Sequence, residues 1–153
     1  SYLRRSPNNV QLFVCMKANK CLLVFGLSTH QEIKRSATFA REPGGFAVSL
    51  SGDRLYVSFP DENRVRVFNS VTLLEEASID VIKPRELTMT ANGRLLFCGC
   101  DDGKIRAIDT ASLKLDKIFD VPGTPKHLLL SPDDARLYVG YSDKTVMTVI
   151  QVE

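Results

Sequence analysis

Residues 131–152 read SPDDARLYVGYSDKTVMTVIQV and contain the pattern that the rest of the chain repeats. The segment predicts a turn, a strand at 135–141, a tight polar turn at 142–144 and a second strand at 145–152. The prediction rests on alternating apolar residues bounded by clusters of turn-forming residues. The unit is therefore a β-hairpin preceded by a turn.

Three earlier segments have the same layout. They are ANGRLLFCGCDDGKIRAID at 91–109, SGDRLYVSFPDENRVRVFN at 51–69 and PNNVQLFVCMKANKCLLVF at 7–25. An Arg-Leu pair begins at Arg54, Arg94 and Arg136, and Gln11 takes the place of this arginine in the first copy. The copies recur at a drifting step of about 40 residues, which is typical of the blades of a β-propeller.

The repeat predicts an all-β chain, a β-propeller with about four blade repeats of four antiparallel strands. The expected repeats are approximately 1–45, 46–85, 86–125 and 126–153, with the outer strand of the last one missing. We expect no helix longer than about two turns. The segment 71–76 contains helix-favouring leucines and glutamates. Its position within the repeat nevertheless predicts that it leads into an outer strand and does not form a helix.

A chain with about four blades is at the lower limit for a closed ring. The terminal blades would expose apolar faces and unpaired strand edges if they were left alone. We therefore expect the domain to be part of a larger, seven- or eight-bladed propeller. The remaining blades of the same protein, or a second copy of the chain, would complete the ring.

The charges are nearly balanced, with 20 basic and 18 acidic residues interspersed along the chain. This balance argues against an extended nucleic-acid surface and against a polybasic membrane patch. No apolar run approaches the roughly 20 residues of a membrane-spanning helix. The sequence thus predicts neither nucleic acid nor membrane as a partner.

The four cysteines are Cys15, Cys21, Cys98 and Cys100, and all of them fall within strand patterns. Cys98 and Cys100 lie on one face of one strand, which suits packing better than a mutual disulfide. We predict free thiols and a reducing, cytoplasmic compartment. Cys15 could be a reactive thiol, although a buried and inert one is favoured.

No metal or other cofactor is predicted. The chain has no CxxC pair, and its histidines have no ligand-like spacing to the cysteines. The pairs at 101–102 and 133–134 offer carboxylates to calcium, but each pair lies in a turn and lacks EF-hand spacing. The glycines at 44–45 lack the lysine and the following helix of a phosphate loop.

Two segments carry a family resemblance: residues 130–150 and 100–109 resemble the repeat core of WD-repeat and YVTN-type propellers. Residues 121–139 resemble the YVTN form, in which a Gly-x-x-Pro loop precedes a Ser-Pro-Asp turn. The chain departs from the WD pattern because it has no Trp. Asp102 and Asp143 match the turn aspartates that bond backbone amides in the hairpins of the family.

The resemblance implies a fold more than a function. The first hypothesis is a non-catalytic scaffold for protein–protein interaction within a larger protein. The alternative is part of a propeller enzyme, or a ligand-binding YVTN-type propeller, with a site at the central channel. The inner strands offer only Glu86 and His127 as polar candidates, which favours binding. A third reading is a spacer with no ligand.

A binding site is predicted on one rim, where inter-blade loops meet hairpin turns. The loops are 41–45, 83–85 and 123–126. The predicted partner-binding residues are Arg41, Lys83, Arg85, Lys126, His127, Asp61, Asp101, Asp102 and Asp143, with Glu62 nearby. The expected partner is a protein, because a mixed-charge rim suits electrostatic specificity.

Overall fold

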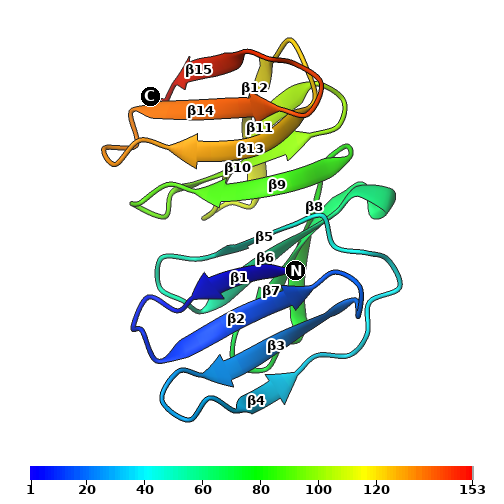
Figure 1. The fold of residues 1–153 in the computed structure, drawn as a ribbon, viewed down its shortest axis with the longest axis vertical. Helices are drawn as coiled ribbons and strands as arrows, with labels where there is room; N and C mark the ends of the chain where they lie inside the picture. Colours follow the sequence, from blue (N-terminus) through cyan, green and yellow to red (C-terminus); the bar gives the residue numbers. More distant parts are fainter. Residues whose placement is uncertain (153) are drawn as a thin grey trace.

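The computed structural model describes residues 1–152 and shows four antiparallel sheets (Figure 1). Blade 1 contains β1 (Tyr2–Arg5), β2 (Gln11–Met16), β3 (Cys21–Gly26) and β4 (Glu32–Arg35). Blade 2 contains β5 (Gly45–Val48), β6 (Arg54–Phe59), β7 (Arg64–Asn69) and β8 (Glu75–Asp80). Blade 3 contains β9 (Pro84–Met89), β10 (Leu95–Cys100), β11 (Lys104–Asp109) and β12 (Lys114–Asp120). Blade 4 contains β13 (Pro125–Leu130), β14 (Arg136–Tyr141) and β15 (Met147–Gln151).

Each blade is a meander in which successive strands are hydrogen-bonded neighbours. The first strands of the blades, β1, β5, β9 and β13, contact one another in that order, whereas the last strands lie outside (Figure 1). This is the arrangement of a β-propeller, and it confirms the predicted fold class. Within residues 1–152 the only helical segment is a short 3-10 turn, Pro60–Glu62, and none is long and apolar enough to cross a membrane.

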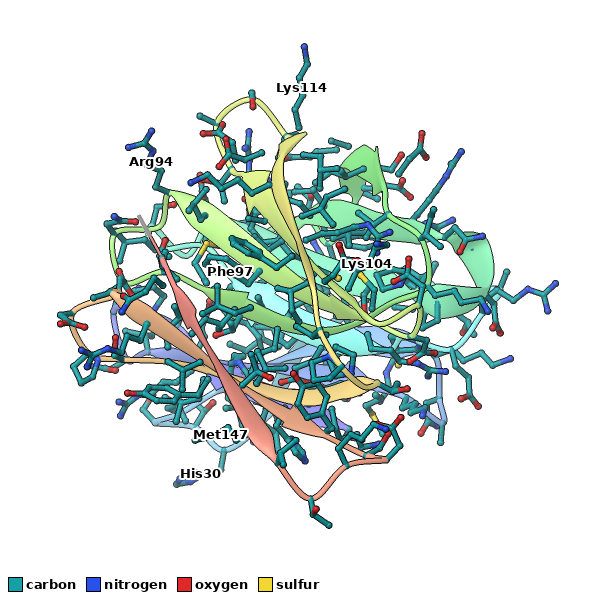
Figure 2. All side chains as sticks on the ribbon, turned by 90° about the horizontal axis from the view of Figure 1, so that it is seen from above. His30, Arg94, Phe97, Lys104, Lys114 and Met147 are labelled. Carbon is teal, nitrogen blue, oxygen red and sulfur yellow. The ribbon has the colours of Figure 1, made fainter. Side chains whose placement is uncertain are left out.

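The blades pack face to face, so the middle strands are buried on both sides. In β6, Leu55 and Val57 pack against blade 1, while Tyr56 between them packs against blade 3. In β10, Leu96 faces blade 2 and Phe97 faces blade 4, and Figure 2 labels Phe97 near the middle of the molecule. This two-sided burial explains why apolar residues occur at both parities of these strands.

The inner strands approach one another closely because small residues stand where they meet. A Cβ on Gly45 would lie 1.9 Å from the carbonyl oxygen of Arg85, so no larger residue fits there without a backbone shift. Beside it, the Ser58 hydroxyl donates a 2.6 Å hydrogen bond to the same carbonyl. Blades 2 and 3 are thus joined at their inner ends by backbone-level contact.

Several predicted boundaries were wrong by one to three residues. β15 begins at Met147 rather than at 145, because its first ladder partner is Gly140 and the preceding turn is correspondingly longer. Arg85 and Lys126 lie in strands β9 and β13, not in loops. Both inner strands extend toward the rim because they begin pairing at Pro84 and Pro125.

All four cysteines are free and buried, as predicted. The sulfur atoms of Cys98 and Cys100 lie 3.7 Å apart between blades 2 and 3. Burial raises the pKa of the Cys15 thiol to about 12, so this group stays protonated and is a poor nucleophile at neutral pH. The cysteines therefore act as small apolar residues of the core.

We predict that Leu96→Ala destabilises the chain by about 3 kcal/mol, because it leaves a cavity at the fully buried interface of blades 2 and 3. Leu115→Ala removes the same atoms from β12, where the side chain is 44% exposed, and should cost about 0.5 kcal/mol or less. Urea denaturation of both variants measures the difference. Equal losses would contradict the assignment of the core to the blade interfaces.

Candidate functional site at the channel mouth

The rim is built from inter-blade loops that are hydrogen-bonded to the hairpin turns of neighbouring strands. The amide of Asp101 donates to the carbonyl of Lys83 at 3.0 Å, and the amide of Lys83 donates to the Asn63 side chain at 2.9 Å. The amide of Thr124 donates to the Asp143 carboxylate, also at 2.9 Å. The two groups of loops that the sequence placed on one rim are therefore joined there.

A cavity of about 360 Å³ opens where the inner strands reach this rim. Four of the predicted residues line it: Arg85, Asp101, Lys126 and His127. Glu86, the other polar candidate of the inner strands, lines the same cavity. The structure therefore gathers the inner-strand candidates and part of the rim into one concave site, which we call the channel mouth.

The other predicted residues do not line the channel mouth. Arg41, Lys83 and Asp61 are exposed elsewhere on the loops and turns. Asp143 binds the backbone of the inter-blade loop rather than its own hairpin. Asp102 is bound by Arg106. It therefore does not play the part that the resemblance implies, which is to bond backbone amides in its hairpin. Two of the acids predicted for the mixed-charge rim, Asp102 and Asp143, are therefore engaged in hydrogen bonds within the chain.

Arg85 and Asp101 form the ion pair at the edge of the channel mouth. The Arg85 Nε donates to an Asp101 carboxylate oxygen at 2.7 Å, and both side chains are partly exposed. On the opposite wall, Lys17 lies 3.9 Å from Glu42. Exposed pairs of this kind contribute little to stability.

Glu86 is the half-buried carboxyl of the channel mouth. Burial raises its pKa, and the nearby charges of Arg4, His127 and Lys126 oppose that rise. Tyr2 lies beside it and donates a 2.5 Å hydrogen bond to the carbonyl of Gly44. Burial also raises the pKa of Tyr2, and the negative charge of Glu86 adds to this rise.

No sequence pattern predicts that Tyr2 lines the cavity or that the charge of Arg4 acts on Glu86. Tyr2 and Arg4 belong to β1, which the repeat pattern identified only as the end of a strand. Tyr2 lies near Glu86 and His127 because blades 1, 3 and 4 all contribute residues to this cavity. That convergence is a property of blade geometry and has no local sequence signal.

Arg106 holds the hairpin turn of blade 3 against the protein body. Its guanidinium makes two hydrogen bonds to the Asp102 carboxylate, at 2.9 and 2.6 Å, and its side chain is only 6% exposed. A third contact of 3.5 Å reaches the carbonyl of Ile82 in the segment between blades 2 and 3. The bond from Arg106 lowers the pKa of Asp102. This pair positions Asp101, which is next in sequence to Asp102.

The arrangement is suited to binding through charge and hydrogen bonds. No group of three His, Cys, Asp or Glu side chains in the part of the chain that the structure describes could hold a metal ion. Glu86, Tyr2 and His127 line the cavity with polar atoms that can form hydrogen bonds to a ligand. Lys126 and His127 are exposed on the inner strand β13 and line the cavity, so a ligand that enters the channel mouth contacts them first.

No family model matches the chain, and no curated protein matches it. Among solved structures, the chain is similar to hydrazine synthase of Kuenenia stuttgartiensis, with a TM-score of 0.84 and 20% sequence identity. The likeness covers 96% of this chain and 44% of that chain. At this identity the similarity shows the fold alone, since propellers host many unrelated functions.

We predict that Asp102→Asn destabilises the chain by about 2 kcal/mol at pH 7, because it leaves the buried charge of Arg106 without its partner. Since Arg106 lowers the folded-state pKa of Asp102, the stabilisation is present above the unfolded pKa of about 3.9 and is lost as pH falls through the folded pKa. Urea denaturation at pH 7 and pH 2.5 should show a larger loss on acidification for the wild type than for the variant.

The matched control is Asp116→Asn, which makes the same change on the exposed outer strand β12. It should leave both the stability at pH 7 and its dependence on pH close to those of the wild type. If the two variants lose the same stability at pH 7, the Asp102–Arg106 pair contributes no more than an ordinary surface charge.

Proposed function

We propose that this chain is a non-catalytic interaction module that binds a segment of a protein partner at the channel mouth. Its blades are divergent repeats of the WD and YVTN type, and the compartment is cytoplasmic, in keeping with four free thiols. The observation that carries the proposal is the cavity of about 360 Å³ that gathers Arg85, Asp101, Lys126 and His127.

The geometry supports recognition of a protruding peptide segment. A cavity of this size accepts one or two side chains but not a folded domain. Its walls come from inner strands and from loops that are hydrogen-bonded to hairpin turns, so the charged groups are presented by a rigid frame. Charges held in this way favour specificity and rapid association more than raw affinity.

Reversing the charge of the channel mouth tests this proposal. The double variant Arg85→Glu/Lys126→Glu should retain partner proteins at least about fivefold less well than the wild type, because it changes the charge that the partner meets. The melting temperature should remain nearly unchanged, since the Arg85–Asp101 pair is partly exposed. Quantitative mass spectrometry of proteins retained by the immobilised chain measures the effect.

Lys114→Glu/Lys117→Glu is the matched control, because both lysines lie on the exposed outer strand β12 and Figure 2 shows Lys114 extending away from the protein. This control should capture partners as the wild type does. Equal recovery with the channel-mouth variant and the control would place the partner site on the opposite rim or on the outer strands.

A second candidate function is the binding or conversion of a small molecule at the same place. The convergence of Tyr2, Glu86 and His127 around one cavity favours it, since propeller sites near a channel need such polar groups. The two functions differ in the size of the ligand. They therefore respond differently to small compounds.

For the interaction module, we expect a panel of small carboxylic acids and sugars at millimolar concentration to leave the melting temperature unchanged. A ligand that binds the folded chain would raise that temperature by mass action. A rise that is abolished by His127→Ala and kept by Lys114→Glu would establish the small-molecule function instead. Differential scanning fluorimetry is the measurement.

A further inference from the structure

The charged groups of the channel mouth are unequally paired. Arg85 is paired with Asp101, and Lys17 lies near Glu42. Neither pair involves Lys126, which is exposed at the entrance. Arg4 of β1 adds a positive charge that acts on Glu86, and the His127 imidazole lines the same cavity as Glu86. Once the paired groups are set aside, the entrance offers mainly hydrogen-bond donors with positive charge.

Glu86 is the carboxylate in the middle of these donors. Within residues 1–152, no other residue donates a hydrogen bond that stabilises the charged form of Glu86. Asp102, by contrast, is stabilised in its charged form by a hydrogen bond from Arg106. The groups that face it are Tyr2 and Arg4 from β1, and Lys126 and His127 from β13. Arg85 from its own strand and Asp101 at the end of β10 line the same cavity.

We propose that the segment bound at the channel mouth is acidic, and that Glu86 takes up a proton when the acidic group of the partner enters. This inference rests on the interaction function proposed above. It adds the chemical class of the ligand and a residue that sets the pH dependence of its affinity.

The reasoning follows from charge and burial. An entering carboxylate gains from Lys126 and His127, but at neutral pH it meets the like charge of Glu86. Partial burial already favours the neutral form of Glu86, and a second carboxylate favours it further. The protonated carboxyl can then donate a hydrogen bond to the ligand. Affinity for an acidic segment therefore rises as pH falls.

Blocked hexapeptides of alternating glutamate and glycine, and of alternating lysine and glycine, are the probes. Their binding to the whole chain is measured by fluorescence anisotropy at pH 7.5, 6.5 and 5.5 in low salt, which limits screening. The glutamate peptide should bind about tenfold more tightly at pH 5.5 than at pH 7.5, and the lysine peptide should bind less tightly at every pH.

Glu86→Gln removes the charge while keeping the shape of the side chain. At pH 7.5 this variant should bind the glutamate peptide about threefold to tenfold more tightly than the wild type, and its affinity should depend less on pH. Asp116→Asn changes the net charge equally on the outer strand β12 and should bind as the wild type does.

Two results would overturn the inference: tighter binding of the lysine peptide, or equal affinities for Glu86→Gln and Asp116→Asn. Failure of the glutamate peptide to bind, while partner capture still depends on Arg85 and Lys126, would overturn the acidic ligand but leave the proposed function standing. Partner capture that is insensitive to reversal of those two residues would instead overturn the proposed function. Melting temperatures of all variants show whether each is folded.

Discussion

The face-to-face burial of apolar residues between neighbouring blades is the interaction on which the rest of the structure depends. A single antiparallel sheet of four short strands cannot bury enough surface alone. Here Leu55 and Val57 pack toward blade 1, Tyr56 packs toward blade 3, and the same division recurs in β10. Stacking in turn fixes the inner strands around the channel, and the channel mouth follows from that placement.

The fold was predictable because each copy of the repeat has the same local sequence pattern. Arg54, Arg94 and Arg136 mark the same turn-to-strand junction in successive copies, so one hairpin interpreted correctly gives the others. Strand ends were less predictable. The sequence predicts Arg85 in a loop because it follows Lys83 and Pro84, whereas pairing with β10 extends the strand to include it. Pairing between strands is a tertiary property that local propensity does not contain.

The candidate site was predictable only in part, for a similar reason. The predicted residues Lys126, His127, Arg85 and Asp101 line one cavity because loops and turns of a propeller share a rim. Asp102 looked equally suitable, but the sequence does not reveal that Arg106 turns inward and binds it. Charged residues that alternate with apolar ones usually face water. Arg106 is buried instead, because the carboxylate of Asp102 four positions earlier neutralises its charge.

The exposure of blade 4 affects how the walls of the cavity can move. Its sheet has three strands in the part of the chain that the structure describes, and its outer strand β15 is half exposed, with Met147 at the surface (Figure 2). The strands β10 and β11 of blade 3 are mostly buried, and local opening costs least where few apolar contacts are buried. Lys126 and His127 stand on this blade, whereas Arg85 and Glu86 stand on the more deeply anchored blade 3. One wall of the cavity can therefore fluctuate against a stationary opposite wall.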